Sequence, residues 1–382
     1  MRQFVFEAAA ETEEERTLRH SVRDFLISEQ ANGGFVPVAD CWVSGVSPEF
    51  SRKLGQQGWL GLTWPVQYGG RGLSALHRLV VTEELLVAGA PVAAHWIADR
   101  QTGPQIFKFG TEDQKQRILP RIAAGECFTC AGMSEPQAGS DLAAIRTRAD
   151  RSSGGPWVLN GRKIWSTVAH ISDFMIVLAR TRPAEGKDRH VGLSQFLVDM
   201  SLPGVEVSGI RDIAGQTHFN EVLFDNVEMA HDALLGVEGN GWSQCMGELA
   251  VERSGPERYL TTFLLLERLL ATMREQVPSV VLGELIARVA TLRIMSRGIA
   301  GSLQRGNNPD TEAALVKQMG NAFEKHLFNT VRAILSAHPE PGIDPELLTL
   351  RDEVQLRLPA SSLRGGTTEI LRGVIARQLG VR

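Results

Sequence analysis

The sequence predicts an α+β protein with several domains, because the spacing of its apolar residues changes twice along 382 residues. Residues 1–125 and 230–382 repeat apolar side chains at the interval of amphipathic helices. Residues 126–229 instead contain short β-prone runs with no helical stretch between them. We therefore expect a helical N-terminal domain, a middle antiparallel domain resembling a small β-barrel or sandwich, and a C-terminal domain resembling a four-helix bundle.

The N-terminal domain is expected to consist of several amphipathic helices. One face of the first carries Leu18, Val22, Phe25 and Leu26. Ser47 and Thr111 precede further helices as N-caps, and helical patterns also cover 74–88 and 93–103. The glycine-rich segment 58–72 lacks the preceding strand and the Lys-Ser/Thr pair of a phosphate-binding loop, so we interpret it as a turn between helices.

The middle domain is expected to contain a hairpin at Asn160-Gly161. This dipeptide separates two short strands in residues 157–165, and Asn-Gly is the strongest short signal for a two-residue type I′ turn. The other expected strands are 127–133, 174–179, 192–198, 204–207 and 218–227.

The C-terminal domain is expected to contain long helices, with one feature that interrupts the first of them. Helical periods cover 241–276, 280–301, 311–336 and 368–379. Pro256 lies four residues after Glu252, so it lacks the N–H that would bond to the Glu252 carbonyl. A kink or break is therefore expected after Glu252.

Composition excludes several classes of function. The net charge is −4 and no long run of Lys or Arg occurs, which argues against binding to nucleic acid or anionic membranes. Cys127 and Cys130 have C-x-x-C spacing, but no second ligand pair completes a zinc site, so we expect buried, reduced thiols and no metal. The acidic start and the lack of a ~20-residue apolar run indicate a cytoplasmic protein without a membrane span.

Three motifs in order give the chain a resemblance to a known family. They are Ser134-Glu135-Pro136-Gln137-Ala138-Gly139-Ser140-Asp141, then Asn160-Gly161-Arg162-Lys163-Ile164-Trp165-Ser166-Thr167, and finally Gly366-Thr367-Thr368-Glu369-Ile370. With these motifs the chain resembles the acyl-CoA dehydrogenase family of flavoproteins from about residue 15 to the end. The resemblance implies the acyl-CoA dehydrogenase fold, FAD as cofactor, and α,β-dehydrogenation of an acyl-CoA or acyl-carrier-protein thioester.

The resemblance also implies roles for the motif residues. Trp165 is expected against the isoalloxazine ring, Thr167 near its N5, and Met133 and Ser134 at its pyrimidine edge. Ser140 is expected to serve the FAD phosphate or the acyl-CoA. Thr367 and Glu369, in the C-terminal signature, are further candidates for cofactor binding.

The reaction needs a carboxylate that removes the proton α to the thioester. Many family members carry it two residues before the Thr of the C-terminal signature, where this chain has Gly365. A second lineage, resembling isovaleryl- and long-chain-type dehydrogenases, takes the base from a Glu-Arg pair, here Glu252-Arg253. We therefore expect Glu252 to be the base; the alternative is a solvated helix carboxylate paired with Arg253 or Arg258.

Gly365 keeps its backbone N–H, and the resemblance implies that this group helps hold the thioester oxygen. Two family features that reach the FAD of a neighbouring subunit are missing. The Arg-x-x-Phe-Gly segment is absent near residues 273–281, and the Gly-Gly-x-Gly segment is absent in 338–358.

Several arrangements therefore stay open. FAD is held by altered contacts in a homo-oligomer, or the chain is a half-site or non-catalytic subunit of a heteromer resembling some bacterial steroid dehydrogenases. An oxidase on the same fold is a further alternative, whereas a dehydrogenase would pass its electrons to an electron-transfer flavoprotein.

Overall fold

A computed structural model describes residues 4, 6–7, 10–151, 154–184, 188–338 and 342–381, with the backbone alone at 248–251. Residues 1–3 and 339–341, which entered the expectations about compartment and about the missing glycine segment, lie outside that part. The chain forms two compact units. The first unit comprises Met1–Val46, Leu73–Val92 and Leu249–Arg382, and the second comprises Ser47–Gly72 and Ala93–Glu248. The division into three consecutive domains stays a prediction.

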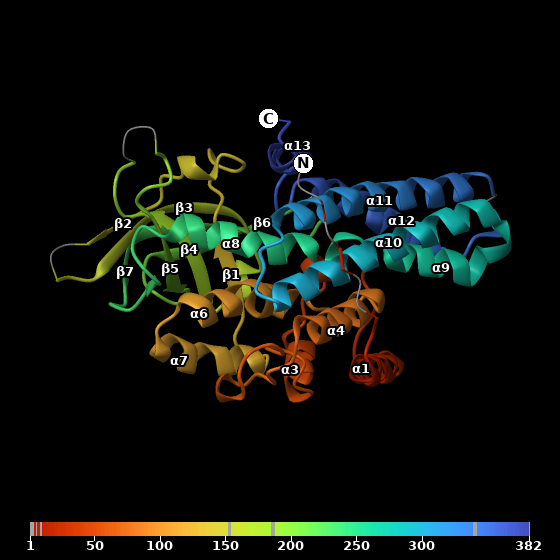
Figure 1. Ribbon diagram of the computed structural model, residues 1–382, viewed down its shortest axis with the longest axis horizontal. Helices are drawn as coiled ribbons and strands as arrows, with labels where there is room; N and C mark the ends of the chain where they lie inside the picture. The colour runs from red at the N-terminus through yellow and green to blue at the C-terminus, as the bar shows by residue number, and fades with distance from the viewer. Residues whose placement is uncertain are drawn as a thin grey trace. The chain divides into compact units, whose positions relative to one another are not determined.

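The expected order of helices, sheet and helices is confirmed (Figure 1). The strands, all in the second unit, are β1 (Thr129–Gly132), β2 (Arg148–Arg151), β3 (Trp157–Thr167), β4 (Phe174–Arg180), β5 (Leu193–Asp199), β6 (Val205–Ile210), β7 (Phe219–Met229) and β8 (Leu234–Leu235). They form one sheet in the order β6-β7-β3-β2-β4-β5-β8, with β1 beside β4. Most pairs are antiparallel, but β4 pairs in parallel with both β1 and β2.

The hairpin predicted at Asn160-Gly161 is wrong. Both residues lie inside β3, which continues through them and pairs with β2 on one side and β7 on the other. A register shift between Leu159 and Gly161 marks a bulge, and a Cβ built at Gly161 overlaps the Thr147 hydroxyl. The glycine is therefore used for close approach of another segment rather than for a turn.

Both faces of β4 are buried, and alternate residues serve two cores. Met175, Val177 and Ala179 join the core that lies between the strands. Ile176 packs with apolar residues of α6 and α7 on the opposite face, and Leu178 packs with Cys245.

The helices of this unit are α3 (Pro48–Gln56), α5 (Ala93–Ile97), the π-helical turn η2 (Ala98–Thr102), α6 (Gly103–Phe109), α7 (Glu112–Ala123) and the start of α8 (Gly241–Ser254), with short 3-10 turns η1 (Val66–Tyr68), η3 (Leu142–Ala144) and η4 (Ala169–Ile171).

The regular secondary structure among the described residues of the first unit is all helical. Its elements are α1 (Glu13–Ala31), α2 (Cys41–Ser44), α4 (Ala75–Val87), η5 (Pro256–Arg258), α9 (Phe263–Met273), η6 (Arg274–Gln276), α10 (Ser279–Gln304), α11 (Asp310–Ser336), α12 (Pro345–Arg357), η8 (Leu358–Ser362) and α13 (Thr368–Gln378). Figure 1 shows α10 and α11 side by side, and α13 also packs on α11. Helices α1 and α4 of the N-terminal region belong to this unit rather than to the unit that contains the sheet.

The predicted helix starts are confirmed in detail. The Ser47 hydroxyl accepts a hydrogen bond from the Phe50 N–H (3.1 Å), as an N-cap residue does. Thr111 and Gln114 cap α7 reciprocally, each side chain accepting from the backbone N–H of the other.

The helical segment expected over 241–276 is divided, and the break expected within it is confirmed. Helix α8 ends at Ser254, Gly255 is extended, and Pro256 starts η5. A proline cannot donate to the carbonyl four residues earlier, so the break follows directly from the sequence.

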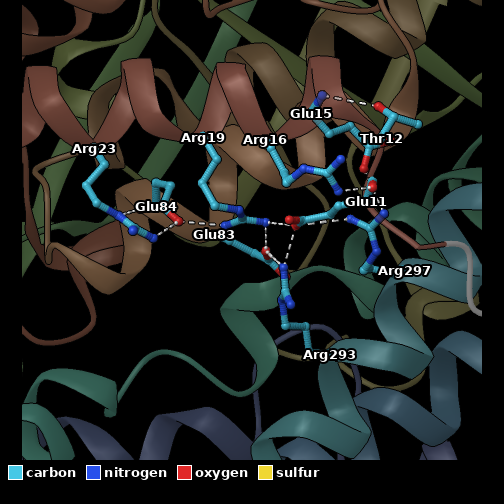
Figure 2. Close-up of polar contacts among 10 residues, drawn as sticks. All are labelled: Glu11, Thr12, Glu15, Arg16, Arg19, Arg23, Glu83, Glu84, Arg293 and Arg297. Atoms are coloured by element: carbon cyan, nitrogen blue, oxygen red, sulfur yellow. Dashed lines mark hydrogen bonds and ion pairs between the residues drawn. The ribbon is translucent and has the colours of Figure 1, made fainter.

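Ion pairs among α1, α4 and α10 hold the first unit together (Figure 2). Arg19 of α1 donates to Glu83 (2.7 Å) and Glu84 (2.6 Å) of α4, and Arg293 of α10 reaches Glu83 at 3.0 Å. Glu11 joins the network by accepting from Arg19 and from Arg293 (2.6 Å). Burial opposes the charge on Arg19, but these carboxylates outweigh it and raise the pKa of the guanidinium.

In the part of the chain that the structure describes, no helix combines the length and the apolar character needed to cross a lipid bilayer. No group of three or more His, Cys, Asp and Glu side chains in that part is arranged to hold a metal ion. Cys127 and Cys130 are buried and unpaired with each other, as expected, and burial raises the pKa of each thiol to about 12.

Two helix-interior glycines test the packing of α11 in the first unit. A Cβ at Gly320 overlaps the backbone carbonyl of Arg258, whereas a Cβ at Gly283 in α10 meets nothing within 4 Å. We expect Gly320→Ala to destabilise the protein, because backbone atoms must move. We expect Gly283→Ala to stabilise it by about 1 kcal/mol, because alanine favours a helix over glycine. Urea unfolding of both variants measures the difference; equal effects would contradict this packing.

Candidate functional site

The second unit brings together the two motif segments whose residues are expected at the isoalloxazine, residues 133–141 and 160–167; we call the surface they form the wall. The Ile164 N–H in β3 donates to the Ser134 carbonyl at 3.0 Å, so the chain after β1 lies against β3. Lys163 strengthens this junction, since its ammonium donates to the Met133 carbonyl and to a Glu135 carboxylate oxygen, each at 3.0 Å. Met133 and Ser134 are therefore fixed beside the strand that carries Trp165.

Glu135 holds the rest of this loop in place. One of its oxygens accepts from the Thr147 N–H (2.8 Å), and the other accepts from the Arg146 N–H (2.7 Å) and from the Gln137 amide (2.6 Å). Burial alone would raise the pKa of Glu135, but Lys163 and these donors lower it to about 2. Burial lowers the pKa of Lys163 to about 8, against the attraction of Glu135. The pair is thus a buried ionic anchor for the wall.

A bulge turns Trp165 out of the core. Lys163 pairs with Val222 and Ser166 with Asn220, so β3 has one residue more than β7 between these points. Strict alternation would bury Trp165 on the same face as Lys163. The extra residue instead places Ser166 inside and leaves Trp165 57% exposed.

The backbone of Trp165 is also unusual. Its φ is +63°, a left-handed conformation that costs a bulky residue about 1–3 kcal/mol. The indole contacts the edge of Phe219, with ring centroids 6.0 Å apart. A large aromatic face is thus held toward solvent at a cost in strain, with the partly buried Thr167 two residues on. Such a surface suits a planar ring system such as isoalloxazine.

Ser140 belongs to the first of the two motif segments. It is exposed, next to Asp141, whose carboxylate pairs with Arg189 at 2.7 Å. Its expected contact with a phosphate or an acyl-CoA therefore stays a prediction.

The first unit brings Glu252 and Gly365 together. The residue after Glu252, Arg253, donates from its Nε to the Gly365 carbonyl at 3.3 Å, although the two residues are 112 positions apart in the sequence. Gly365 has a φ of +62°, and a Cβ built on it overlaps one carboxylate oxygen of Glu252 and lies 3.1 Å from its Cδ. The Glu252 carboxylate therefore occupies the space that a side chain at position 365 would take.

Arg258 holds Glu252 in this position. The Glu252 carbonyl, which Pro256 leaves without a helical donor, accepts instead from the Arg258 guanidinium at 2.9 and 2.6 Å. The same guanidinium reaches a Glu252 carboxylate oxygen at 3.3 Å. Arg258 is buried and Glu252 is partly exposed, so the predicted pairing with Arg258 exists and leaves the carboxylate accessible.

Trp42 connects the two sides of this site. The guanidinium of Arg258 lies over its ring, 5.1 Å from the centroid, and so does that of Arg364, at 4.5 Å. Arg364 also pairs with Asp40 at 2.8 Å. Because Arg364 immediately precedes Gly365, one aromatic ring helps position both the carboxylate and the glycine.

Thr367 and Glu369 begin α13. The Thr367 hydroxyl accepts from the Ile370 N–H at 3.4 Å, as an N-cap, and Glu369 is exposed in the first turn. Bonds from its own N–H and from Thr367 lower the pKa of Glu369. A capping role accounts for both residues locally, and their expected role in cofactor binding stays a prediction.

Sequence reasoning missed the roles of two buried lysines, one in each unit. Lys163 lies on the same strand face as Trp157 and Leu159, and it is 0% exposed. Lys317 lies on the buried face of α11 with Ala313 and Val316, and it is also 0% exposed. A lysine on an otherwise apolar face is the signal that would have indicated both residues.

Known proteins share this organisation. The sequence patterns of the acyl-CoA dehydrogenase N-terminal domain and of the acyl-CoA dehydrogenase middle domain match residues 12–126 and 130–227, together more than half of the chain. The acyl-CoA dehydrogenase IpdE1 of Mycobacterium tuberculosis is 42% identical over 204 residues, which are 53% of this chain and 52% of that protein. The acyl-CoA dehydrogenase FadE34 of the same organism is 33% identical over 342 residues, 87% of this chain and 46% of that protein. The chain spans about half the length of these relatives.

Solved structures resemble the chain over almost its whole length. The Tcur3481-Tcur3483 steroid ACAD has a TM-score of 0.84 at 26% identity and covers 98% of this chain and 99% of its own. The ChsE4-ChsE5 complex from Mycobacterium tuberculosis has a TM-score of 0.81 at 26% identity, with the same coverage.

Two tryptophans of β3 give a matched test of the wall. We expect Trp165→Gly to change the free energy of unfolding by less than about 1 kcal/mol, because lost surface contacts are offset by relief of the left-handed strain. We expect Trp157→Gly, at a buried position, to cost about 3–5 kcal/mol. Urea unfolding measures both values.

The same pair separates stability from flavin binding. The flavin absorbance retained per chain after gel filtration is expected to fall in Trp165→Gly. Full retention of flavin in Trp165→Gly would contradict the assignment of Trp165 to the wall.

Proposed function

The chain belongs to the acyl-CoA dehydrogenase family, and we propose on that basis that it binds FAD and desaturates the Cα–Cβ bond of an acyl thioester. Members of this family are FAD flavoproteins. The observation that carries the proposal is the placement of the Glu252 carboxylate in the space left by the missing side chain of Gly365. In many family members the side chain at the position of Gly365 is itself the catalytic carboxylate.

Glu252 is the proposed base. A carboxylate at this place removes the proton from Cα, and the electron pair of that C–H bond forms the new double bond as hydride leaves Cβ. FAD, when bound, supplies the acceptor for that hydride. Arg258 fixes both the backbone and the carboxylate of Glu252, so the base is oriented before substrate arrives.

Gly365 is proposed to bind the thioester oxygen through its N–H. In the described part of the chain, the N–H groups of Gly365 and Gly366 donate to no protein acceptor. A free backbone donor beside the base stabilises the negative charge that develops on the thioester oxygen as the α proton leaves. The glycine thereby keeps a donor while making room for Glu252.

The cofactor is proposed to rest on the wall of the second unit. The exposed indole of Trp165, Thr167 and the anchored Met133–Ser134 segment support this placement. Ser140, Thr367 and Glu369 are proposed as further contacts, as the family resemblance implies.

The chain is proposed to act in an oligomer, either with copies of itself or with a different subunit. The segments that lend contacts to a neighbour's FAD in related homotetramers depart from the family pattern here. The likeness to the ChsE4-ChsE5 complex supports the heteromeric arrangement. The acyl group is proposed to be carried by CoA or by a carrier protein, and the electrons to pass to an electron-transfer flavoprotein.

Glu252→Gln tests the base. We expect the variant to keep its flavin and to lose bleaching by a panel of straight, branched and cyclic acyl-CoA thioesters. We expect the rate to fall by about 100-fold or more, because general base catalysis contributes roughly 10²–10⁴-fold. Stopped-flow absorbance of the anaerobic flavin measures the rate.

Glu275→Gln, an exposed carboxylate of the same unit, is the matched control and is expected to match the parent. Bleaching of Glu252→Gln at the parent rate would contradict the base assignment. A flavin count of zero in the parent purified alone would instead favour a half-site subunit. Rapid reoxidation of the reduced parent in air would favour an oxidase.

A further inference from the structure

Lys317 is a buried cation with a single described acceptor. It lies in α11 at 0% exposure, and its ammonium donates to the Gly366 carbonyl at 2.8 Å. Its Cε lies 3.3 Å from the point where a Cβ on Gly365 would be, and a Cβ at that point would overlap a carboxylate oxygen of Glu252. An ammonium has three donors, so Lys317 brings far more hydrogen-bonding capacity to this place than Gly366 uses.

The turn that Lys317 touches has no side chains to stabilise it. Gly365 and Gly366 both have left-handed φ angles, +62° and +102°, and glycine has the greatest backbone freedom of any residue. The two carbonyls of this pair are held separately, that of Gly365 by Arg253 at 3.3 Å and that of Gly366 by Lys317. Bonds from charged donors are about twice as strong as neutral ones, so they restrain peptide planes that would otherwise rotate.

Fixing a carbonyl also fixes an N–H. All peptide bonds of the described chain are trans, so the N–H of each peptide points away from its carbonyl. The bond from Arg253 to Gly365 therefore sets the direction of the Gly366 N–H, and the bond from Lys317 to Gly366 sets that of the Thr367 N–H. The Gly365 N–H lies in the preceding Arg364–Gly365 peptide, so the two bonds restrain it through the turn rather than through its own peptide plane. The Gly365 and Gly366 N–H groups have no protein acceptor among the described residues.

Stability alone does not explain a lysine here. Burial lowers the pKa of Lys317 to about 7, and the nearby Arg258 lowers it further, whereas Glu252 raises it. A buried charge that is incompletely compensated costs stability, and an apolar residue of similar volume is often better tolerated. The position is therefore suited to orienting the turn rather than to strengthening the fold.

We propose that Lys317 is a positioning residue that, together with Arg253, locks the Gly365–Gly366 turn in one orientation beside the Glu252 carboxylate. This inference rests on the proposed function, in which Glu252 is the base and Gly365 a donor to the thioester oxygen. Lys317 touches neither substrate nor cofactor in this role; it acts through the peptide planes of the turn.

Two substitutions separate the donor from the bulk of the side chain. Lys317→Met and Lys317→Gln each shorten the side chain by one atom, but methionine removes the donor whereas glutamine keeps an N–H donor. With the flavin-loaded chain and the thioester that bleaches the parent fastest, we expect Lys317→Met to lower kcat by about 100-fold, the size of effect that a misplacement of about 1 Å causes. We expect KM to change far less, and Lys317→Gln to recover much of the rate.

Hydrogen–deuterium exchange gives a readout that needs no substrate. In Lys317→Met the segment 360–370 is expected to exchange faster than in the parent, while α10 is unchanged. The proposal would be overturned if Lys317→Met left the exchange of this segment unchanged. It would also be overturned if the Met and Gln variants lost activity equally and their melting temperatures fell in parallel.

The pH profile adds a test that a purely structural role would not move. The charged groups facing Lys317 are Glu252 and Arg253 from α8, Arg258 from η5 and Arg364 from the turn before α13. The folded pKa of Lys317 is depressed, so its ammonium is lost as pH rises through about 7 and the bond to Gly366 weakens. We therefore expect kcat of the parent to fall as pH rises above about 7. We expect no such fall in the Lys317→Gln variant.

Glu324, on the same helix, needs its own control, because burial raises its pKa to about 8. We expect kcat of Glu324→Gln to fall with rising pH as it does in the parent. If this fall disappeared in Glu324→Gln and remained in Lys317→Gln, the assignment to Lys317 would be contradicted. If no thioester bleaches the parent, the proposed function fails, while the exchange measurement still decides the role of Lys317.

Discussion

The structure of the candidate site depends on one steric constraint: a side chain at position 365 and the carboxylate of Glu252 cannot share the same space. Glycine at 365 satisfies it, and the left-handed φ of that residue makes glycine the favoured choice on backbone grounds as well. Under the proposed function, Glu252 of α8 supplies the carboxylate that many family members carry on this turn. Pro256 then ends that helix, and Arg258 takes over the carbonyl that the proline leaves free.

Cationic side chains restrain the groups that this arrangement leaves free to move, namely the Glu252 carboxylate and the glycine turn. Arg258 holds the Glu252 carboxylate, the proposed base, and Arg253 and Lys317 hold the two glycine carbonyls. Trp42 lies beneath the guanidiniums of Arg258 and Arg364. The second unit follows the same logic, because the buried pair of Lys163 and Glu135 anchors the loop that leads from β1. In both units a buried ionic group orients backbone, while the Glu252 carboxylate in one unit and the Trp165 indole in the other stay accessible to solvent.

Much of this organisation was readable in the sequence, and the exceptions share a physical cause. The caps at Ser47 and Thr111 and the break after Glu252 follow from local rules of donors and acceptors, so they were predicted. The Asn160-Gly161 hairpin was predicted wrongly, because the turn signal is local whereas the glycine serves a contact with Thr147. The exposure of Trp165 depends on a bulge against β7, and periodicity within one strand cannot reveal a register shift.

The shared space of Glu252 and Gly365 is tested most directly by a double-mutant cycle on the free energy of unfolding. Gly365→Ala is made in the parent and in a Glu252→Ala background, so that the left-handed strain of the introduced alanine cancels between the two arms. We expect Gly365→Ala to cost more stability in the parent than in the Glu252→Ala background, with a coupling energy of about 1–3 kcal/mol. Additive effects of the two substitutions, within about 0.5 kcal/mol, would contradict the steric constraint.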